Sequence, residues 1–157
     1  MTNFNQLPKA IQLFDKTIIA IDFGMKVTGL GKFTPGRDPY PIPYDQIVYQ
    51  SHEQVIIQIL KVVDLEEAKI VVLGFPTLLD GKETSMTQKI KEFGKQLAAE
   101  LTKKFPQTEF FLQDESLSTY EATSRMKNSP RYNFKVDYSQ IDALSASIVL
   151  EDFLRSN

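Results

Sequence analysis

Residues 17–33, TIIAIDFGMKVTGLGKF, decide the fold, because they place an aspartate inside an apolar strand. The stretch at 17–23 is mostly apolar on both of its faces, which predicts a strand in the middle of a sheet. Asp22 interrupts this pattern, and Gly24 follows it at a predicted turn. A carboxylate that is buried without a partner destabilises the fold, or else its pKa rises. Asp22 therefore needs partners from other parts of the chain.

The composition limits the chemistry that this chain could use. A length of 157 residues fits one domain with a substantial core. The absence of cysteine excludes disulfides, thiol nucleophiles and thiolate metal sites. His52 is the single histidine, which argues against a histidine-ligated zinc site or a histidine-dependent triad. Acid–base or metal chemistry must therefore depend mainly on carboxylates.

Hydropathy and charge predict a cytoplasmic protein without membrane contacts. No apolar run approaches the roughly 18 residues that a membrane span needs, and the first residues do not resemble a secretory signal. Residues 1–16 are predicted to be an N-terminal extension that is flexible or docks through Ile11, Leu13 and Phe14. The net charge of −2 gives no global basic field, so contacts with nucleic acid would need local patches.

Residues 17–157 predict a single α/β domain with a mixed sheet, because a meander of three strands precedes alternating helices and strands. The expected strands cover 17–23, 27–33, about 45–49, 68–76 and 108–116. The expected helices follow Ser51, cover about 86–104, and begin at Ser118 and Ser139. Proline-rich residues 35–46 predict a loop before the third strand. Residues 127–138 predict another loop, long enough to suggest function or mobility.

Three acidic residues are candidate partners for Asp22: Asp114 and Glu115 at the end of the strand at 108–116, and Asp142 in the last helix. Sites in open α/β sheets form at the carboxyl ends of parallel strands, where these residues would converge. Mg²⁺ or Mn²⁺ would neutralise their repulsion and suit metal-assisted cleavage of phosphodiester bonds. Taken alone, the pair Asp114 and Glu115 is better explained as a solvated strand end than as a site, and only one of the two can point at a given site.

Capping boxes offer an alternative role for one of these acids. In this motif a helix-capping serine is followed three residues later by a residue that completes the cap. The candidate pairs are Ser51 with Gln54, Ser118 with Glu121, and Ser139 with Asp142. On this interpretation Asp142 only caps the last helix.

Glycine and lysine residues give weaker signals. Gly24 would permit a positive φ or let a phosphate approach the backbone, although a plain hairpin turn explains it equally well. Lysines recur along the helix at 86–104 and just before it, at Lys82, Lys89, Lys91 and Lys95. A solvated helix face explains these lysines better than phosphate contacts do.

Four motifs give the chain a family resemblance: AIDFGMKVTGLG (20–31), VVLGFPTLLDGKET (71–84), QDESLSTYEA (113–122) and IDALSASIVLEDFL (141–154). In this order and spacing they resemble the YqgF/RuvX family, described as Holliday junction resolvases and as nucleases that mature the 5′ end of 16S rRNA. The resemblance implies an RNase H-like fold, with a mixed five-stranded sheet flanked by helices. It also implies a metal-dependent nuclease acting on precursor 16S rRNA, with branched DNA as an alternative substrate and a monomer or homodimer as the active form.

The resemblance assigns roles to residues position by position. It implies that Asp22, Glu115 and Asp142 are catalytic and hold Mg²⁺ or Mn²⁺. The motif positions that would contact nucleic acid are Gly24, Lys26, Ser118 and Thr119. Three further basic residues are candidates for the same role, namely Lys82, Lys89 and Arg125.

The chain departs from the family pattern around the acids. Met25 stands where the family has threonine, and Ser116 stands where it has arginine, so a hydroxyl and a cation suited to phosphate are absent. Lys82 or Arg125 could replace the lost charge. These departures keep open a second class, an RNase H-like module that binds nucleic acid without cutting it. A third class, an actin-like kinase, shares the turn after Asp22 but normally needs two such lobes.

Overall fold

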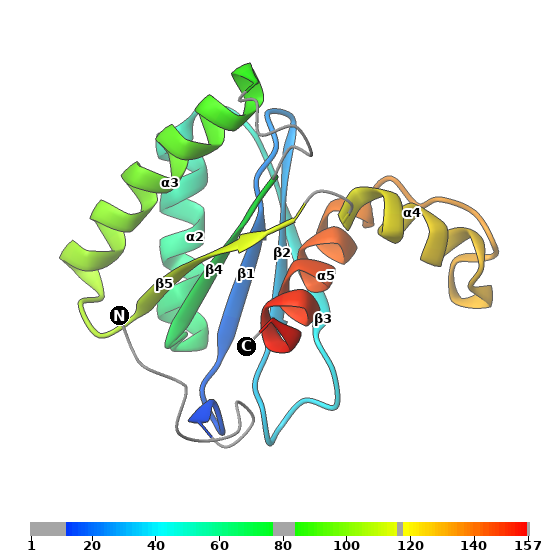
Figure 1. Ribbon diagram of the computed structural model, residues 1–157, viewed down its shortest axis with the longest axis horizontal. Coiled ribbons are helices and arrows are strands. Elements are labelled where there is room, and N and C mark those ends of the chain that lie inside the picture. The colour runs from blue at the N-terminus through cyan, green and yellow to red at the C-terminus, as the bar shows by residue number, and fades with distance from the viewer. Residues whose placement is uncertain (1–11, 77–83, 116–117, 157) are drawn as a thin grey trace.

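A five-stranded sheet runs through the centre of the computed structural model, which describes residues 12–76, 84–115 and 118–156 (Figure 1). The strands are β1 (Ile18–Asp22), β2 (Val27–Phe33), β3 (Ile42–Val48), β4 (Ile70–Phe75) and β5 (Glu109–Asp114). The helices are α2 (His52–Glu66), α3 (Ser85–Lys104), α4 (Ser118–Lys127) and α5 (Ile141–Arg155), and a short 3-10 helix, η1, spans Pro130–Tyr132. This order of elements confirms the predicted alternation of strands and helices.

The sheet is mixed, as predicted from the sequence. Its strand order is β3-β2-β1-β4-β5. The first three strands form an antiparallel meander, whereas β4 and β5 run parallel to β1. Because parallel strands end at the same edge of a sheet, the carboxyl ends of β1, β4 and β5 lie together.

The two faces of β1 pack against different helices. Ile19 and Ile21 belong to the apolar layer beneath α2 and α3, and Ile18 and Ala20 belong to the layer beneath α5. Side chains alternate along a strand, so Asp22 continues the Ile18–Ala20 face and lies on the α5 side of the sheet. The alternation therefore turns this carboxylate towards the last helix.

Helix α5 lies directly on β2, because two glycines leave room for its backbone. A Cβ atom at Gly29 would overlap the carbonyl group of Asp142, and one at Gly31 would lie 2.8 Å from the backbone nitrogen of Ser147. The register pairs Gly29 with Asp22 and Gly31 with Ala20, so both glycines face α5. The close approach of α5 to the sheet therefore depends on these two glycines.

The third strand is longer than predicted. We expected it at about 45–49 after a loop at 35–46, but β3 begins at Ile42 and includes Pro43. Proline is tolerated here because β3 is an edge strand, and a register shift between Leu30 and Gly31 lies opposite this part of it.

The helix caps partly follow the predictions. Ser51 caps α2, and its hydroxyl accepts a hydrogen bond from the Gln54 N–H at 3.0 Å, as expected. The cap predicted at Ser118 is wrong, because Ser118 is the first residue of α4 itself. Its predicted partner, Glu121, instead accepts a hydrogen bond from Arg125 one turn later at 2.7 Å.

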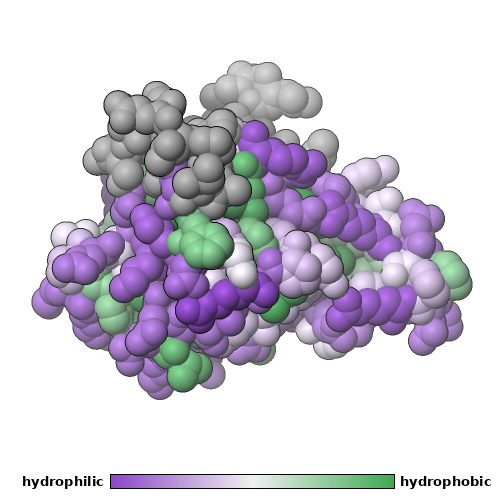
Figure 2. Space-filling model, turned by 90° about the horizontal axis from the view of Figure 1, so that it is seen from below, coloured by the Kyte–Doolittle hydropathy of each residue, from purple (hydrophilic) through white to green (hydrophobic). Residues whose placement is uncertain are grey.

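The N-terminal side and the surface of the domain add three observations. Leu13 is fully buried in the apolar layer beneath α5, while the domain boundary at residue 17 stays a prediction. Within the described ranges, no helix has both the length and the apolar character needed to cross a membrane. Hydrophilic side chains dominate the face seen from below in Figure 2.

Candidate active site

Asp22, the last residue of β1, keeps partial contact with solvent, although protein atoms surround most of its carboxyl group. Burial raises the pKa of this carboxyl to about 6. A hydrogen bond from the Ser145 hydroxyl acts in the opposite direction, and the nearby charge of Asp142 raises the pKa further. Loss of hydration and a like charge both disfavour the ionised form. The ionised form of Asp22 therefore destabilises the folded state, as its position in an apolar strand suggested.

Asp142 is the second residue of α5 and faces the same side of the sheet. Partial burial raises the pKa of its carboxyl group. The predicted capping box with Ser139 is wrong, because the Ser139 hydroxyl donates to the Asp137 carboxylate at 2.6 Å. The N-cap residue of α5, Gln140, makes no side-chain capping hydrogen bond. The structure therefore does not support the alternative in which Asp142 only completes a capping box with Ser139.

Gln46 on β3 replaces the missing cap. Its side-chain Oε1 accepts hydrogen bonds from the backbone N–H groups of Asp142 at 2.9 Å and Ala143 at 3.0 Å. Free N–H groups in the first turn of a helix need such an acceptor. A residue 96 positions away in the sequence thus fixes the start of α5.

A row of three residues across β1, β2 and β3 builds this part of the site. Asp22 pairs with Gly29, and Gly29 pairs with Gln46. Asp22, Gly29 and Gln46 therefore lie side by side on three neighbouring strands. The first turn of α5 packs over Gly29, between the other two residues. The sequence contains no local signal for Gln46, because its position depends on the register of β3.

Glu115 directly follows β5, and its backbone N–H donates to the carbonyl of Phe75 at 2.8 Å. One strand, β4, separates β5 from β1, so two strand spacings, about 10 Å in all, separate their backbones. Over residues 12–76, 84–115 and 118–156, no three acidic or histidine side chains are grouped closely enough to hold a metal ion together. The structure thus brings Asp22 and Asp142 together, whereas Glu115 lies along the same edge.

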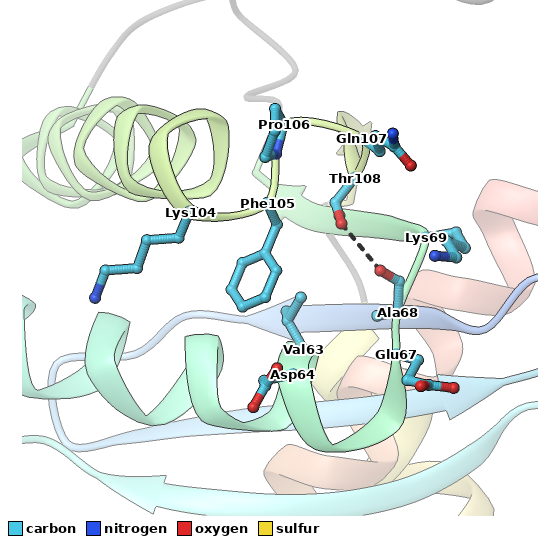
Figure 3. Close-up of a pocket in the computed structure, with 10 residues that line it drawn as sticks. All are labelled: Val63, Asp64, Glu67, Ala68, Lys69, Lys104, Phe105, Pro106, Gln107 and Thr108. Carbon is cyan, nitrogen blue, oxygen red and sulfur yellow. Dashed lines mark hydrogen bonds between the residues drawn. The ribbon is translucent and has the colours of Figure 1, made fainter.

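The opposite edge of the sheet carries a cavity that is remote from these acids. It lies between the end of α2, the start of β4 and the segment after α3 (Figure 3). There the Thr108 hydroxyl donates to the Ala68 carbonyl at 3.0 Å. Since β4 begins here and the acids follow the carboxyl ends of the strands, this cavity is not part of the candidate site.

The turn after Asp22 is closed by its own backbone rather than opened for a ligand. Gly24 does not adopt a positive φ. A Cβ atom on it would overlap the carbonyl oxygen of Val27, which explains why glycine is needed. Lys26 is exposed in this turn, and Met25 packs against the apolar layer beneath α2 and α3. Met25 therefore contributes to the core, whereas a threonine would offer a hydroxyl.

The start of α4 connects to Asp22 through Ser145. The hydroxyls of Thr119 and Ser145 lie 3.4 Å apart, and Ser145 is fully buried. Ser118 is also buried, so its hydroxyl is not available at the surface. Of the predicted lysine contacts, Lys89 is exposed on α3, whereas Lys82 lies outside the described residues, as does Ser116.

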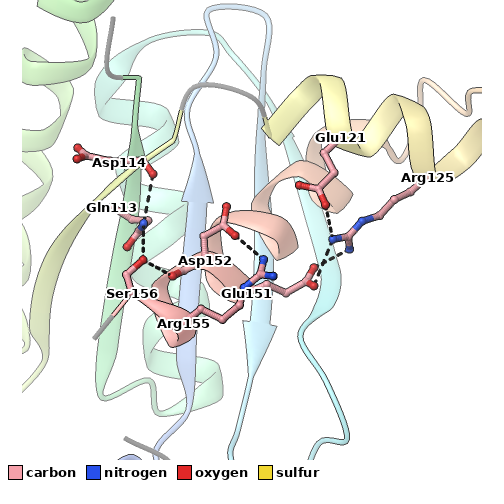
Figure 4. A network of polar contacts seen from close by, with 8 residues as sticks. All are labelled: Gln113, Asp114, Glu121, Arg125, Glu151, Asp152, Arg155 and Ser156. Carbon is pink, nitrogen blue, oxygen red and sulfur yellow. Dashed lines mark hydrogen bonds and ion pairs between the residues drawn. The ribbon is translucent and has the colours of Figure 1, made fainter. Parts of the chain in front are cut away.

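Arg125 takes part in a network of charged groups between α4 and α5 (Figure 4). It donates hydrogen bonds to Glu121 and Glu151, each at 2.7 Å. These contacts raise the pKa of the guanidinium group, the hydrogen bond with Glu151 contributing most. Two carboxylates thus offset the charge that we predicted to contact nucleic acid.

The arrangement of strands and helices in this chain resembles that of known resolvases. RuvC from T. thermophilus, solved in complex with a Holliday junction substrate, has a TM-score of 0.56 at 9% identity, over 90% of this chain and 96% of that one. The yeast mitochondrial resolvase Ydc2 has a TM-score of 0.55 at 13% identity, over 90% and 79%. These likenesses establish the RNase H-like fold.

The sequence comparison identifies the family. Residues 16–156 match the model of RuvX, described as a Holliday junction resolvase, and the chain belongs to this family. A protein of Malacoplasma penetrans (strain HF-2) is 32% identical over 150 residues, covering 93% of this chain and 99% of that protein. One from Orientia tsutsugamushi (strain Ikeda) is 30% identical over 153 residues, covering 96% and 92%. Both bear the name "Putative pre-16S rRNA nuclease". The chain is therefore a nuclease, a phosphodiester hydrolase.

Proposed function

We propose that this protein is a metal-dependent nuclease that matures the 5′ end of precursor 16S rRNA in the cytoplasm. The names of its relatives support the substrate. The observation that carries the proposal is the pair Asp22 and Asp142, two carboxylates with raised pKa values whose charges act on each other at one edge of the sheet. Such a pair destabilises the fold when both groups are ionised, and a bound cation would offset that repulsion.

The carboxylates at this edge are the kind of donor that would suit Mg²⁺ or Mn²⁺. Asp22 and Asp142 would supply carboxylate oxygens, the donors that these ions prefer. Glu115, which follows β5 at the same edge, would supply a third. When bound, the cation would stabilise the charge that develops during phosphodiester hydrolysis.

The surrounding residues would hold the two aspartates in place. Ser145 donates to Asp22 and, with Thr119, orients its carboxylate. Gln46 fixes the first turn of α5 and thereby the backbone of Asp142. The exposed side chains of Lys26 and Lys89 would attract the phosphate backbone.

The test is cleavage of a 5′-extended precursor 16S rRNA with Mg²⁺ or Mn²⁺ by the wild type, Asp142→Asn and Asp114→Asn. Asp114 is a matched control, because it is an exposed carboxylate at the end of β5. We expect the wild type and Asp114→Asn to cut, and the folded Asp142→Asn variant to lose activity. Equal cutting by all three proteins would remove Asp142 from the mechanism.

A four-way DNA junction belongs in the same assay, because the family is described as a Holliday junction resolvase. Preferential cleavage of the junction would replace RNA as the proposed substrate. Binding of the RNA without cleavage by any of the proteins would instead support the non-catalytic binding module.

A further inference from the structure

Residues 118–140, here called the arm, project from the body of the domain next to α5 (Figure 1). They comprise α4, η1 and the segment that returns to α5. Both ends of the arm lie at the candidate site: Thr119 is close to Ser145 at one end, and Asp142 follows the other. A nucleic acid bound at the two aspartates would therefore have the arm beside it.

A small apolar cluster holds the arm against α5. Ala122 and Met126 of α4 are fully buried there with Ile141, Leu144 and Ile148 of α5. Tyr132 and Val136 of the returning segment pack on the same cluster. The arm thus has an inner side that stabilises it.

The outer side of the arm combines aromatic and basic groups. Three of the five exposed aromatic side chains among the described residues belong to it, namely Tyr120, Phe134 and Tyr138, which are 75%, 61% and 79% exposed. Three exposed cations accompany them, at Lys127, Arg131 and Lys135. In the part of the chain that the structure describes, none of these three cations forms an ion pair. This differs from Arg125, whose charge is offset, and from the chain as a whole, whose net charge is −2.

Phe134 has an unfavourable backbone conformation. Its φ is 59°, and that of the preceding Asn133 is 54°, so both residues lie in the left-handed region. Asparagine adopts this conformation readily, but phenylalanine does so rarely. The Phe134 N–H donates to the Ser129 carbonyl at 3.0 Å, which fixes the turn. Because the ring is largely exposed, packing of the side chain does not explain why phenylalanine occupies this position.

We propose that the arm binds unpaired nucleotides adjacent to the scissile phosphate, a step that rests on the proposed nuclease function. Phe134 and Tyr138 would stack on exposed bases, which an aromatic ring does with little regard to sequence. Lys127, Arg131 and Lys135 would neutralise the phosphates of the same strand. The substrate class is therefore a nucleic acid with a single-stranded segment beside the cut, as in an unprocessed RNA end, rather than a continuous duplex.

The experiment measures binding in EDTA, where no metal-dependent cleavage occurs. The probes are a fluorescein-labelled single-stranded RNA of about 12 nucleotides and a blunt duplex of the same length. The wild type is expected to prefer the single strand. Phe134→Gly should weaken that binding about tenfold while melting no earlier than the wild type, since glycine relieves the left-handed conformation.

A charge variant tests the cations of the arm. The triple variant Lys127→Gln, Arg131→Gln, Lys135→Gln should lower the slope of log affinity against log salt by about two, since each contact with a single strand contributes about 0.7. The matched control carries the same charge change on exposed lysines outside the arm, at Lys61, Lys69 and Lys103. The control should bind the single strand as the wild type does.

The outcomes separate this proposal from the proposed function. Unchanged binding by Phe134→Gly, or equal losses in the two triple variants, would overturn the role of the arm even if the wild type cuts RNA. Loss of binding confined to the arm variants would support the arm, even if the wild type failed to cut any substrate.

Discussion

Replacing Asp22 with asparagine should make the metal-free protein more stable at neutral pH. The pKa of this carboxyl rises from its ordinary value of 3.8 to about 6 in the folded protein. Since each tenfold difference corresponds to about 1.4 kcal/mol, the ionised form destabilises the fold by about 3 kcal/mol at pH values above both pKa values. Asparagine removes the charge and keeps an oxygen that can accept from Ser145. We therefore expect a gain of about 2 to 3 kcal/mol in the free energy of unfolding.

The destabilising effect of Asp22 depends on pH. A raised pKa means that the folded state favours the protonated carboxyl, so the wild type loses stability as the pH rises from about 4 through about 6. Asp22→Asn lacks this loss. The two proteins should therefore be equally stable below about pH 4 and differ fully above about pH 7.

Thermal unfolding in EDTA at several pH values measures the effect. For a chain of this length, a gain of 2 to 3 kcal/mol corresponds to a rise in Tm of roughly 5 to 10 °C. Asp114→Asn, which removes an exposed carboxylate at the same edge, serves as the control and should change little. An Asp22→Asn variant that melts at or below the wild-type temperature at pH 8 would refute the assignment of Asp22 as a strained, partly buried carboxylate.

Three further predictions follow from the same geometry. Addition of Mn²⁺ in excess should raise the Tm of the wild type but not that of Asp22→Asn; an equal rise in both would place the ion elsewhere. Gln46→Leu removes the acceptor for two N–H groups of α5 and should cost about 1 to 2 kcal/mol in urea unfolding, with faster hydrogen exchange at the Asp142 amide; unchanged exchange would contradict the capping role. Gly29→Ala places a methyl group against the backbone of Asp142 and should cost about 3 kcal/mol or more, or prevent folding; a urea midpoint like that of the wild type would show that α5 can move away.

Local pattern was sufficient for most elements of the fold, because the apolar residues of β1 and the helical spacing on α3 follow burial directly, whereas the start of β3 was placed too late. The same pattern identified Asp22 as a candidate site residue, since a carboxylate inside an apolar run needs an explanation. The role of Gln46 could not be predicted, because it depends on how β3 aligns with β2 after a register shift. The pairing of Arg125 with Glu151 could not be predicted either, because it depends on how α4 packs against α5. A local contact decided against Ser139 as the partner of Asp142: its hydroxyl donates to the Asp137 carboxylate instead, although the spacing from Ser139 to Asp142 fits a capping box.

The packing of α5 on Gly29 and Gly31 has a consequence for the growing polypeptide. Asp22 belongs to the first strand of the sheet, and its partner Asp142 belongs to the last helix, which Gln46 holds from 96 residues away. While the ribosome is still translating the messenger, the sheet has no cover over this face, and the two acids cannot meet. On the proposed assignment of Asp22 and Asp142 to the active site, a chain that lacks α5 would carry every strand but no assembled site, and nuclease activity would therefore require α5.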